Sequence, residues 1–587
     1  MQKYVTLIRN KIHNPIVILT IAILAFLIYT IIFPLVEILV TTFMNVGNDE
    51  GFSLQAWKSV FASDISQALI YSPIVQTFQI GIFVSIISLG IGSLLAWVVI
   101  RTDLKYKKLV SFLLILPYML PSWFNAFIWL IVFKNDRIGG QTGLIQANFN
   151  VSPPDWLSYG AVPIILSLSA HYYLFAFLLV GAALSSINSD VEESATILGA
   201  KTWKVLRKVT FPLVIPAIVS AFILIFSKSI GSFGVPALLG LPVRYYTLST
   251  MIYSNISTGQ QVTGYILSLV LIVSAIIVIW MNQKVISRRN YTTIGGKGSK
   301  QKLISLGIWR VPTNIAIWLF IFCLSILPVL LLGIQTLLLK DGVYSLDNLT
   351  LHYWVGESNS AIANGMQGVF QNDRIFSAFK NTIVISFFAA LIAAMIGLVI
   401  GYLITRNKQK WPFRLMDQLS FLPILIPSIA FSAIYLSMFA KPGLFLPSLY
   451  GTIAILILIT VVSELPLTTR TGTSSMIQIS NELEEAGSVL GASWRTRFRR
   501  IIMPLSRKGL LSGFILVFIS AMKELDLLIM LVTPRTMTLT TYTFDLQEQG
   551  YAQTANAVVF IIVISIILVY ALVSIFGKID ITKGIGK

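Results

Sequence analysis

The chain has 587 residues, of which 56% are hydrophobic and only 11% are charged, with a mean hydropathy of +0.82. Ordinary globular domains carry about 25% charged residues, so this composition excludes a soluble globular fold and indicates a chain that lies mostly in lipid. The formal net charge is +19, but the basic residues lie in short loops between apolar runs, which argues against a nucleic-acid binder. The single cysteine, Cys323, excludes a cysteine-based metal site, and the three histidines are scattered. We therefore expect no metal site and no catalytic residues.

Twelve apolar segments reach the length of about 20 residues that a helix needs to cross a bilayer. The first begins near the N-terminus and is too long for the apolar part of a signal peptide, so it is interpreted as a membrane span. The predicted spans are Pro15–Phe43, Val75–Ile100, Leu109–Phe133, Val162–Leu184, Leu213–Phe233, Gly264–Trp280, Ile315–Leu339, Thr382–Ile404, Leu415–Phe439, Gly451–Leu467, Leu510–Ile529 and Ala557–Phe576.

The basic residues set the predicted orientation of these spans. Lysine and arginine accumulate in cytoplasmic loops, and most of the 43 basic residues fall on one side if both termini are cytoplasmic. A basic segment at 284–312, with the run GGKGSKQK, has the composition of a flexible linker. It divides the chain into two six-helix halves, 1–283 and 313–587.

The two halves resemble each other at three ordered places, which is typical of an internal repeat. The matching phrases are LPYMLPS (Leu116–Ser122) with LPILIPS (Leu422–Ser428), EESATILGA (Glu192–Ala200) with EEAGSVLGA (Glu484–Ala492), and TLSTMIY (Thr247–Tyr253) with TLTTYTF (Thr538–Phe544). Because each half has an even number of spans, both halves point the same way. Such a parallel repeat has its axis along the membrane normal and encloses a path between its halves.

The loop after the fourth span of each half, 189–212 and 481–504, predicts a short helix–glycine–helix element. Ser189 with Glu192 reads as a capping box, and Asn481 with Glu484 offers the same chemistry. The acidic pairs that follow suit the first turn of a helix. A glycine then ends the helix in a left-handed conformation, and a proline 13 positions later suits the first turn of the next span. These residues are Gly199 and Pro212 in one half, and Gly491 and Pro504 in the other.

This pattern resembles the EAA loop of type I importer permeases of the ATP-binding cassette (ABC) superfamily. The first copy keeps Glu192, Glu193, Ala195, Gly199 and Pro212, and the second keeps Glu484, Glu485, Ala486, Gly491 and Pro504, with Gly487 in place of the alanine. The resemblance covers nearly the whole chain as a fused tandem of two six-helix domains. It implies that each loop enters a cleft on an ATPase subunit, so the partners are two copies of that ATPase, an extracytoplasmic substrate-binding protein and membrane lipid, in the bacterial plasma membrane.

The chain itself carries no recognisable ATPase motif. The nearest match to a phosphate-binding loop is Gly296-Lys297, which is followed by Gly298 instead of Ser or Thr and has Tyr291 at the first glycine position. We therefore expect a permease subunit that is not an enzyme and holds no cofactor, with ATP and magnesium bound by the partner ATPase.

Two further phrases, SFGVPALLG (Ser232–Gly240) and MKELDLL (Met522–Leu528), resemble the ferric-iron permease group. This group is close to the permeases for thiamine, phosphonates, sugar phosphates and polyamines. The chain departs from the ferric pattern near Ser232, where an acidic residue is often found. An anionic organophosphate therefore stays open as an alternative cargo, beside thiamine and polyamines.

The fifth span of each half ends in polar residues that could line the transport path. They are Lys228 and Ser232 in one half, and Lys523, Glu524 and Asp526 in the other. Ionisable groups inside spans usually face the interior of a helix bundle. The alternative is that Lys523 pairs with a neighbouring carboxylate and that Lys228 reaches the membrane surface.

Two long outer segments, Asn45–Tyr71 and Asp341–Lys380, are expected to contact the binding protein or to pack against their own half. Their aromatic residues are Trp57, Phe61, His352, Tyr353 and Trp354. His171, inside the fourth span, is interpreted as a hydrogen-bonded packing residue. Three competing functions are an ion-coupled secondary transporter, a membrane-embedded enzyme and a structural scaffold. The doubled loop argues against the first, no catalytic cluster supports the second, and the intramembrane charges do not fit the third.

Overall fold

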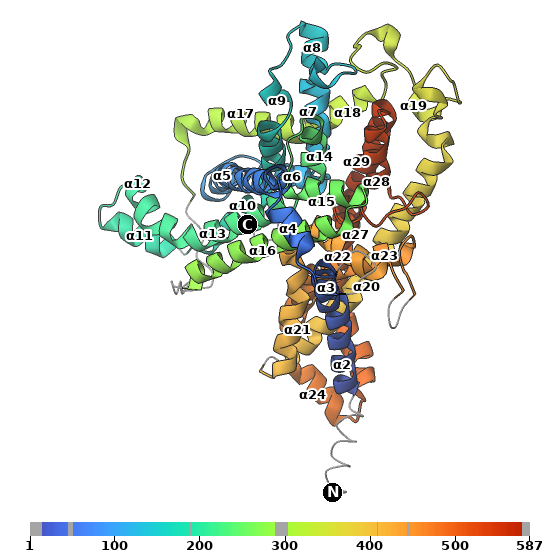
Figure 1. Cartoon of the computed structure of the whole chain (residues 1–587). Coiled ribbons are helices and arrows are strands. Elements are labelled where there is room, and N and C mark those ends of the chain that lie inside the picture. The colour runs from blue at the N-terminus through green and yellow to red at the C-terminus, as the bar shows by residue number, and fades with distance from the viewer. Residues whose placement is uncertain are drawn as a thin grey trace. The chain divides into compact units, whose positions relative to one another are not determined.

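The computed structural model describes residues 15–44, 51–187, 189–287, 303–407, 409–442 and 447–577. Within these ranges the chain is helical and forms only isolated β-bridges, with no strand (Figure 1). The all-α prediction is therefore confirmed. Residues 288–302 of the predicted linker, which include the failed phosphate-loop match, lie outside the described residues.

All twelve predicted spans have a counterpart. Nine helices in the described part of the chain are long and apolar enough to cross a membrane, and three further candidates are helix pairs bent at a short break. The nine are Pro15–Thr42, Gln67–Arg101, Asp155–Ser186, Trp203–Ile230, Gln261–Val278, Gly307–Gln335, Asp373–Arg406, Ile453–Ile477 and Ala552–Leu572. The bent pairs are Lys107–Met119 with Phe124–Phe133, Trp411–Leu425 with Ser428–Phe439, and Trp494–Leu505 with Arg507–Met522.

Two of the bends coincide with the repeated proline phrases. Helices α6 (Lys107–Met119) and α7 (Phe124–Phe133) meet at 88°, and the segment containing α21 (Trp411–Phe421) meets α22 (Ser428–Phe439) at 109°. The residue before proline avoids the helical conformation, and Leu120 before Pro121 is extended. The third span of each half is therefore broken at the same place in the repeat.

The chain divides into two compact units. Unit 1 comprises Met1–Trp57, Gln261–Ile266 and Phe376–Tyr542, and unit 2 comprises Lys58–Gln260, Leu267–Ile375 and Thr543–Lys587. Each unit thus contains segments from both halves of the sequence.

In unit 1, helices α20 (Asp373–Arg406) and α23 (Ile453–Ile477) approach closely through glycines. A methyl group on Gly401 would collide with the backbone of Gly472, and one on Gly472 with the backbone of Gly397. Small residues allow this approach, which is the usual way that membrane helices gain packing contacts. The other long helix of this core is α27 (Arg507–Met522), which packs against α23.

The first span also packs within unit 1. It consists of α2 (Pro15–Leu27), a π-helical turn and α3 (Phe33–Thr42). Helix α3 lies against α22, where the buried Tyr435 hydroxyl donates to the Thr30 carbonyl at 2.9 Å. The first span of one sequence half therefore packs on the broken third span of the other half.

Unit 2 is built on α5 (Ser72–Arg101), α10 (Ala161–Ser186) and α13 (Phe211–Ile230), which pack against one another. The first span of the second half, α17 (Arg310–Ile321) and α18 (Leu327–Gln335), packs here on α6 and α7. The Ser325 hydroxyl between them donates to the Leu113 carbonyl at 3.1 Å. This is the same exchange of first spans as in unit 1.

The other helices of unit 2 include several short ones and two further spans (Figure 1). They are α8 (Leu144–Phe149), α9 (Asp155–Ser158), α14 (Gly234–Leu239), α15 (Leu248–Ser257), α19 (His352–Val355) and the long helices α16 (Gln261–Ser287) and α29 (Ala552–Gly577). Helices α4 (Gln55–Phe61), α16 and α28 (Leu539–Glu548) each cross the boundary between the two units.

Candidate functional site

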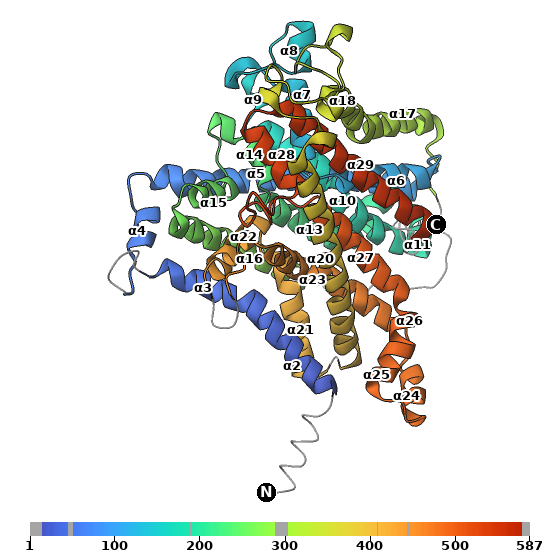
Figure 2. The same ribbon diagram turned by 90° about the vertical axis from the view of Figure 1, so that its right-hand side faces the viewer.

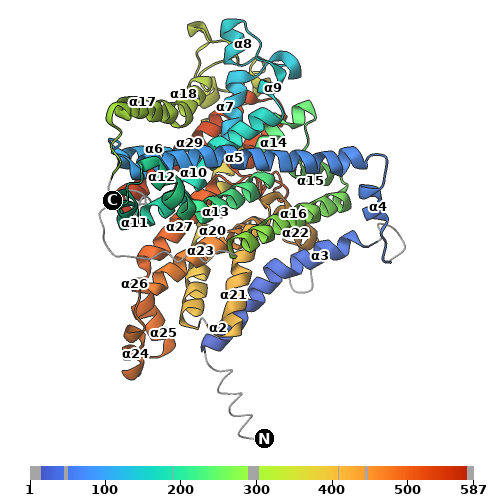
Figure 3. The ribbon, with the colours of Figure 1, turned by 90° about the vertical axis from the view of Figure 1, so that its left-hand side faces the viewer.

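The first predicted helix–glycine–helix element is present in unit 2. Helix α11 (Ser189–Ile197) ends before Gly199, whose φ is +81°, and α12 (Thr202–Val205) follows. The Gly199 N–H donates to the Thr196 carbonyl at 2.9 Å, and the Ala200 N–H donates to the Ala195 carbonyl at 3.0 Å. These two bonds form the Schellman motif, in which a left-handed glycine closes the helix. Figure 3 shows α11 and α12 beside the C-terminal end of α5.

The second element, in unit 1, has the same geometry. Helix α24 (Asn481–Val489) ends before Gly491 at a φ of +77°, and α25 (Trp494–Arg497) follows (Figure 2). The Ala492 N–H donates to the Gly487 carbonyl at 3.0 Å, as its counterpart does in the first copy. The predicted left-handed glycines and the paired short helices are confirmed.

The predicted capping boxes are not both as expected. The residue that caps α24 is Ser480, whose hydroxyl accepts from the Glu482 N–H at 3.2 Å, and not Asn481. The Asn481 side chain instead accepts a hydrogen bond from Arg406. In the first copy, the side chains of residues 189–191 lie outside the described part.

Glu192 and Glu484, the first glutamates of the two acidic pairs, each bind an arginine from another span. In unit 2, Arg101 at the end of α5 forms an ion pair with Glu192, and the Thr210 hydroxyl donates to the other carboxylate oxygen at 2.6 Å. The side chains of Arg101 and Glu192 are only 4% and 17% exposed. Because both charges are largely shielded from water, they stabilise the position of the loop only while they are paired.

The same arrangement recurs in unit 1. Arg406 ends α20 and its Nε lies 2.6 Å from Glu484, with both side chains less than 15% exposed. The Tyr402 hydroxyl donates to the second carboxylate oxygen at 2.9 Å and accepts from the Trp494 indole at 3.1 Å. Sequence reasoning had assigned both arginines only to the orientation of the spans. The available signal was their matching place at the end of the second span in each half.

Most of the remaining residues of each loop face outward. Glu193, Glu485 and Ala486 are exposed, while Ala195 is half-buried. The basic residues of the second helices are exposed except Arg497, which is half-buried. At the tip of each loop, directly before the glycine, two large apolar side chains are 85% to 87% exposed. They are Ile197 and Leu198 in the first copy, and Val489 and Leu490 in the second.

The two prolines occupy different positions. Pro212 lies in the first turn of α13, as predicted. Pro504 lies in the single turn α26 (Met503–Leu505), and the chain bends by 69° before α27 begins at Arg507. The prediction for Pro504 is therefore wrong, because the Ser506 N–H bonds to the Ile502 carbonyl at 2.9 Å and keeps Pro504 within the helical turn that precedes the bend.

The polar residues predicted to line the path lie mostly beyond the helix ends. Helix α13 ends at Ile230 and α27 at Met522, so Ser232, Glu524 and Asp526 fall in the turns that follow, and Lys523 caps α27. Ser232 is 3% exposed, Lys228 is exposed, and the other three side chains are half-buried.

A repeated hydrogen-bond network shows that Ser232 and Glu524 are equivalent positions. The Ser249 hydroxyl donates to the Ser232 carbonyl at 2.7 Å, and the Thr540 hydroxyl donates to the Glu524 carbonyl at 2.7 Å. The acidic residue missing from the first copy is therefore present in the second. The Glu524 carboxylate accepts from the Leu527 N–H at 3.0 Å.

Other predicted residues are packed against their own surroundings. His171 is buried, and its Nδ1 lies 3.2 Å from the Pro117 carbonyl, which confirms the packing role. Tyr353 is buried and donates to the Leu339 carbonyl at 2.8 Å, which fits the alternative that this outer segment packs against its own half. Trp354 packs on Phe560, and Trp57 stacks on Phe43. Phe61 and His352 are half-buried.

Comparison with known proteins finds the same family in each half of the repeat. The family described as binding-protein-dependent transport system inner membrane component matches residues 88–291 and again residues 395–579. The ferric transport system permease protein FbpB of Actinobacillus pleuropneumoniae is 24% identical over 558 residues, which cover 94% of this chain and 77% of the relative. The Fe(3+)-transport system permease protein FbpB 2 of Haemophilus influenzae is 24% identical over 466 residues, 78% of this chain and 80% of the relative.

Among solved structures, one chain of a bacterial ABC transporter involved in the import of the acidic polysaccharide alginate is similar to this chain. The match covers 46% of this chain and 97% of the transporter chain. The identity is 13% and the TM-score 0.35. The two family matches cover both sequence halves, each including one of the helix–glycine–helix loops and several of the predicted spans. The chain is thus a multi-pass protein of the bacterial inner membrane and belongs to the family of binding-protein-dependent transport system inner membrane components.

Proposed function

We propose that this chain is the two-halved channel subunit of an ATP-driven, binding-protein-dependent importer for ferric iron. Membership of the family implies an ATPase and a substrate-binding protein as partners. The two relatives named above are ferric permeases that align over most of this chain, which supports ferric iron as the cargo.

The observation that carries the proposal is the matched pair of apolar loop tips. Ile197 and Leu198 are 85% and 86% exposed, and Val489 and Leu490 are 87% and 86% exposed. Such side chains, held outward at equivalent places by buried ion pairs, are typical of a surface that another protein covers. Two equivalent tips fit two copies of one ATPase subunit. That subunit binds ATP and magnesium, and the ATP is hydrolysed on it rather than in this chain.

The coupling residues in this proposal are those of the two loops. Glu192 and Glu484 hold the loops to their spans, Gly199 and Gly491 turn the chain, and the exposed residues contact the ATPase. The exposed residues include Glu193, Glu485 and Ala486, beside the half-buried Ala195, while Pro212 and Pro504 lead into the next helices. Closure of the ATPase around ATP then favours one of two arrangements of the permease, which moves the cargo inward by alternating access.

We further propose that both termini are cytoplasmic and that the binding protein docks at the opposite end, near Asn45–Tyr71 and Asp341–Lys380. The basic loops on the α11 side support this orientation. In this arrangement Lys228 at the end of α13 and the turns holding Ser232, Lys523, Glu524 and Asp526 lie along the cargo path. Lipid surrounds the spans, and nucleic acid has no role.

The ATPase contact is tested by placing a charge on both tips. Leu198→Glu together with Leu490→Glu should prevent the ATPase from purifying with this chain, because a carboxylate would be buried unpaired in the contact. Phe149→Glu, at a side chain that is 68% exposed but far along the chain from both loops, should leave the complex intact. Normal ATPase retention by the double variant would overturn the proposal.

The cargo is tested by reconstituting the chain with the neighbouring ATPase and binding protein in vesicles. ATPase stimulation is compared for ferric ion, a phosphonate, a sugar phosphate, thiamine and a polyamine. Stimulation by ferric ion alone supports the proposal, and stimulation by one of the others replaces it. Uptake driven by an ion gradient without the ATPase would favour the secondary transporter.

A further inference from the structure

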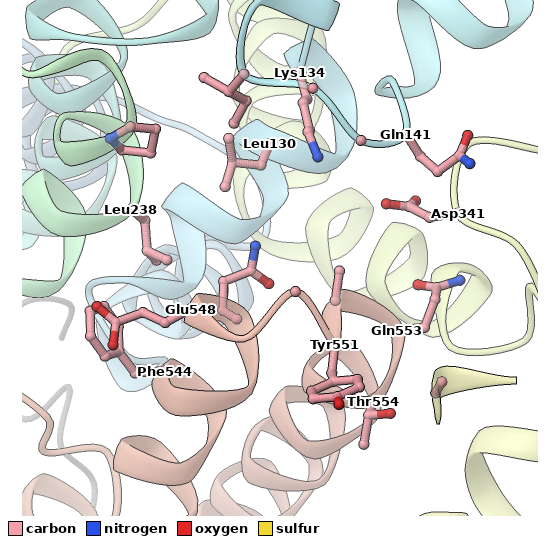
Figure 4. A pocket seen from close by; sticks show the side chains of 18 of the residues that line it. Leu130, Lys134, Gln141, Leu238, Asp341, Phe544, Glu548, Tyr551, Gln553 and Thr554 are labelled. Atoms are coloured by element: carbon pink, nitrogen blue, oxygen red, sulfur yellow. The ribbon is translucent and has the colours of Figure 1, made fainter. Parts of the chain in front are cut away.

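Unit 2 contains a cavity of about 820 Å³, which we call the vestibule. Its walls come from the end of α7, α14, the segment after α18, the end of α28 and the start of α29. Figure 4 shows Lys134 and Asp341 on one side of it, and Glu548 and Phe544 on another.

The vestibule lies at the end of unit 2 opposite to the α11 loop. Helix α10 has 26 residues and spans about 39 Å. Its last residues lead directly into α11, whereas at its start the Gly160 N–H donates to the Leu239 carbonyl of α14 at 2.8 Å. Because α14 contributes Leu238 to the vestibule wall, the vestibule and the coupling loop are separated by the length of α10.

A buried aromatic cluster lies beside the vestibule. Phe233 is fully buried, with its ring centroid 4.7 Å from that of Tyr253 and 5.4 Å from that of Phe544. The rings of Tyr253 and Phe544 meet edge to face at 6.0 Å. Phe544 also lines the vestibule, so the cluster adjoins its wall through this residue.

Tyr253 and Phe544 are the same position in the two halves of the repeat. Thr247 and Thr538 begin their helices with the same bonds, and the following N–H groups donate to Thr77 and Thr382 at 2.9 and 2.8 Å. Counting six residues onward from either threonine leads to Tyr253 and to Phe544. Equivalent residues of a two-fold arrangement can touch each other only near its axis. The cluster therefore lies where a parallel repeat encloses its path.

Carboxylates lie on the vestibule side of this cluster. Glu548 is open to the vestibule, is followed by exposed residues of the α28–α29 turn, and hydrogen-bonds with the Tyr253 hydroxyl. Partial burial, and then the charge of Asp545, raise the pKa of Glu548. The negative charge of Asp545 also favours a cation beside the Glu548 carboxylate. The other charged residues along the vestibule are Lys134, Lys340 and Asp341, of which Lys134 and Asp341 offset each other.

We propose that the vestibule receives a cationic cargo, that the Glu548 carboxylate beside Tyr253 attracts it, and that the Tyr253–Phe544 contact is the barrier which must separate before the cargo passes. A hard cation carries oxygen ligands, and carboxylate and phenol oxygens can exchange with them. A shell of six waters occupies about 180 Å³, so the vestibule holds such an ion with its shell. Within the described residues no group of three or more metal-ligating side chains occurs, which suits passage rather than storage.

The barrier is tested with a reversible cross-link in the chain reconstituted with its ATPase and binding protein. In a Cys323→Ser background, Tyr253→Cys with Phe544→Cys should lose uptake of radiolabelled ferric iron when oxidised and regain it on reduction. Recovery on reduction excludes misfolding as the cause. If the oxidised, cross-linked form takes up as much iron as the reduced form, the proposed barrier is refuted.

The carboxylate is tested in the same vesicles. Glu548→Gln should lower uptake at limiting ferric iron by about tenfold, the scale of one lost hydrogen bond to a charged group. The matched control is Asp136→Asn, an exposed carboxylate near the same end that does not line the vestibule. Unchanged uptake by Glu548→Gln overturns the cargo contact. This inference rests on the proposed import function, and failure of the unmodified complex to take up ferric iron would refute that function instead.

Discussion

The Arg101–Glu192 ion pair makes a quantitative prediction for the coupling loop. Replacing Arg101 by Met removes the cation and leaves Glu192, 17% exposed, with the Thr210 hydroxyl as its remaining hydrogen-bond donor. Removing one partner of a buried pair costs about 3–5 kcal/mol. The Thr210 hydrogen bond and partial hydration of the Glu192 carboxylate reduce this cost to about 2–3 kcal/mol. The loop should then leave its docked position about 30 to 160 times more often.

The assay is hydrogen exchange of the backbone amides of residues 193–200 in the purified chain. In Arg101→Met these amides should exchange faster by about the same factor, because exchange follows local opening. Helix α24, held by its own Arg406–Glu484 pair, serves as an internal control. Arg207→Met, an exposed arginine of the same loop, should have no effect.

A double-mutant cycle separates the charge from the packing. Arg101→Met with Glu192→Gln removes both charges, so most of the lost protection should return. The reasoning is refuted if exchange in α11 is unchanged in the single variant. It is also refuted if the double variant exchanges as fast as the single one.

Three other perturbations test the turn, the packing and the vestibule. Gly491→Ala has open space for its methyl group but keeps a φ of +77°, so it should cost about 1–2 kcal/mol and weaken ATPase stimulation. Gly472→Ala, crowded by the backbone of Gly397, should lower the thermal unfolding midpoint in detergent at a cost of about 1–3 kcal/mol, whereas Gly90→Ala, with no atom within 4 Å, should not. Because the pKa of Glu548 is raised, its carboxylate forms at a higher pH than that of an ordinary glutamate. Uptake should therefore rise with pH as Glu548 loses its proton. Asp545→Asn should move this rise to lower pH, and Glu548→Gln should abolish it.

The α11 loop and the vestibule lie at opposite ends of the 26-residue α10, which gives the proposed transport cycle a physical distance to bridge. A tip that follows the ATPase moves α11, and α11 is tied through Glu192 to the end of α5. Helix α5 also carries Thr77, which bonds the first residue of α15, the helix of Tyr253. A single 30-residue helix therefore contacts both the coupling loop and the helix that bears the proposed barrier.

Local chemistry was sufficient to predict the spans and the glycine turns. A helix in lipid must satisfy its own backbone hydrogen bonds, so its position follows from the length of an apolar run. The left-handed residues Gly199 and Gly491 follow from the absence of a side chain at the end of a short helix. The spans and the glycine turns depend only on neighbouring residues. Their recurrence in both halves therefore made the repeat visible in the sequence.

Only the tertiary structure decided which of these segments contact one another. Arg101 and Glu192 are 91 residues apart, and no local pattern distinguishes a pairing arginine from one that orients a span. The packing of α3 on α22, and of α18 on α7, depends on which apolar faces fit, and in lipid all such faces have similar hydropathy. The contact of Tyr253 with Phe544 likewise required the fold, since the sequence shows that they are equivalent but not that they touch.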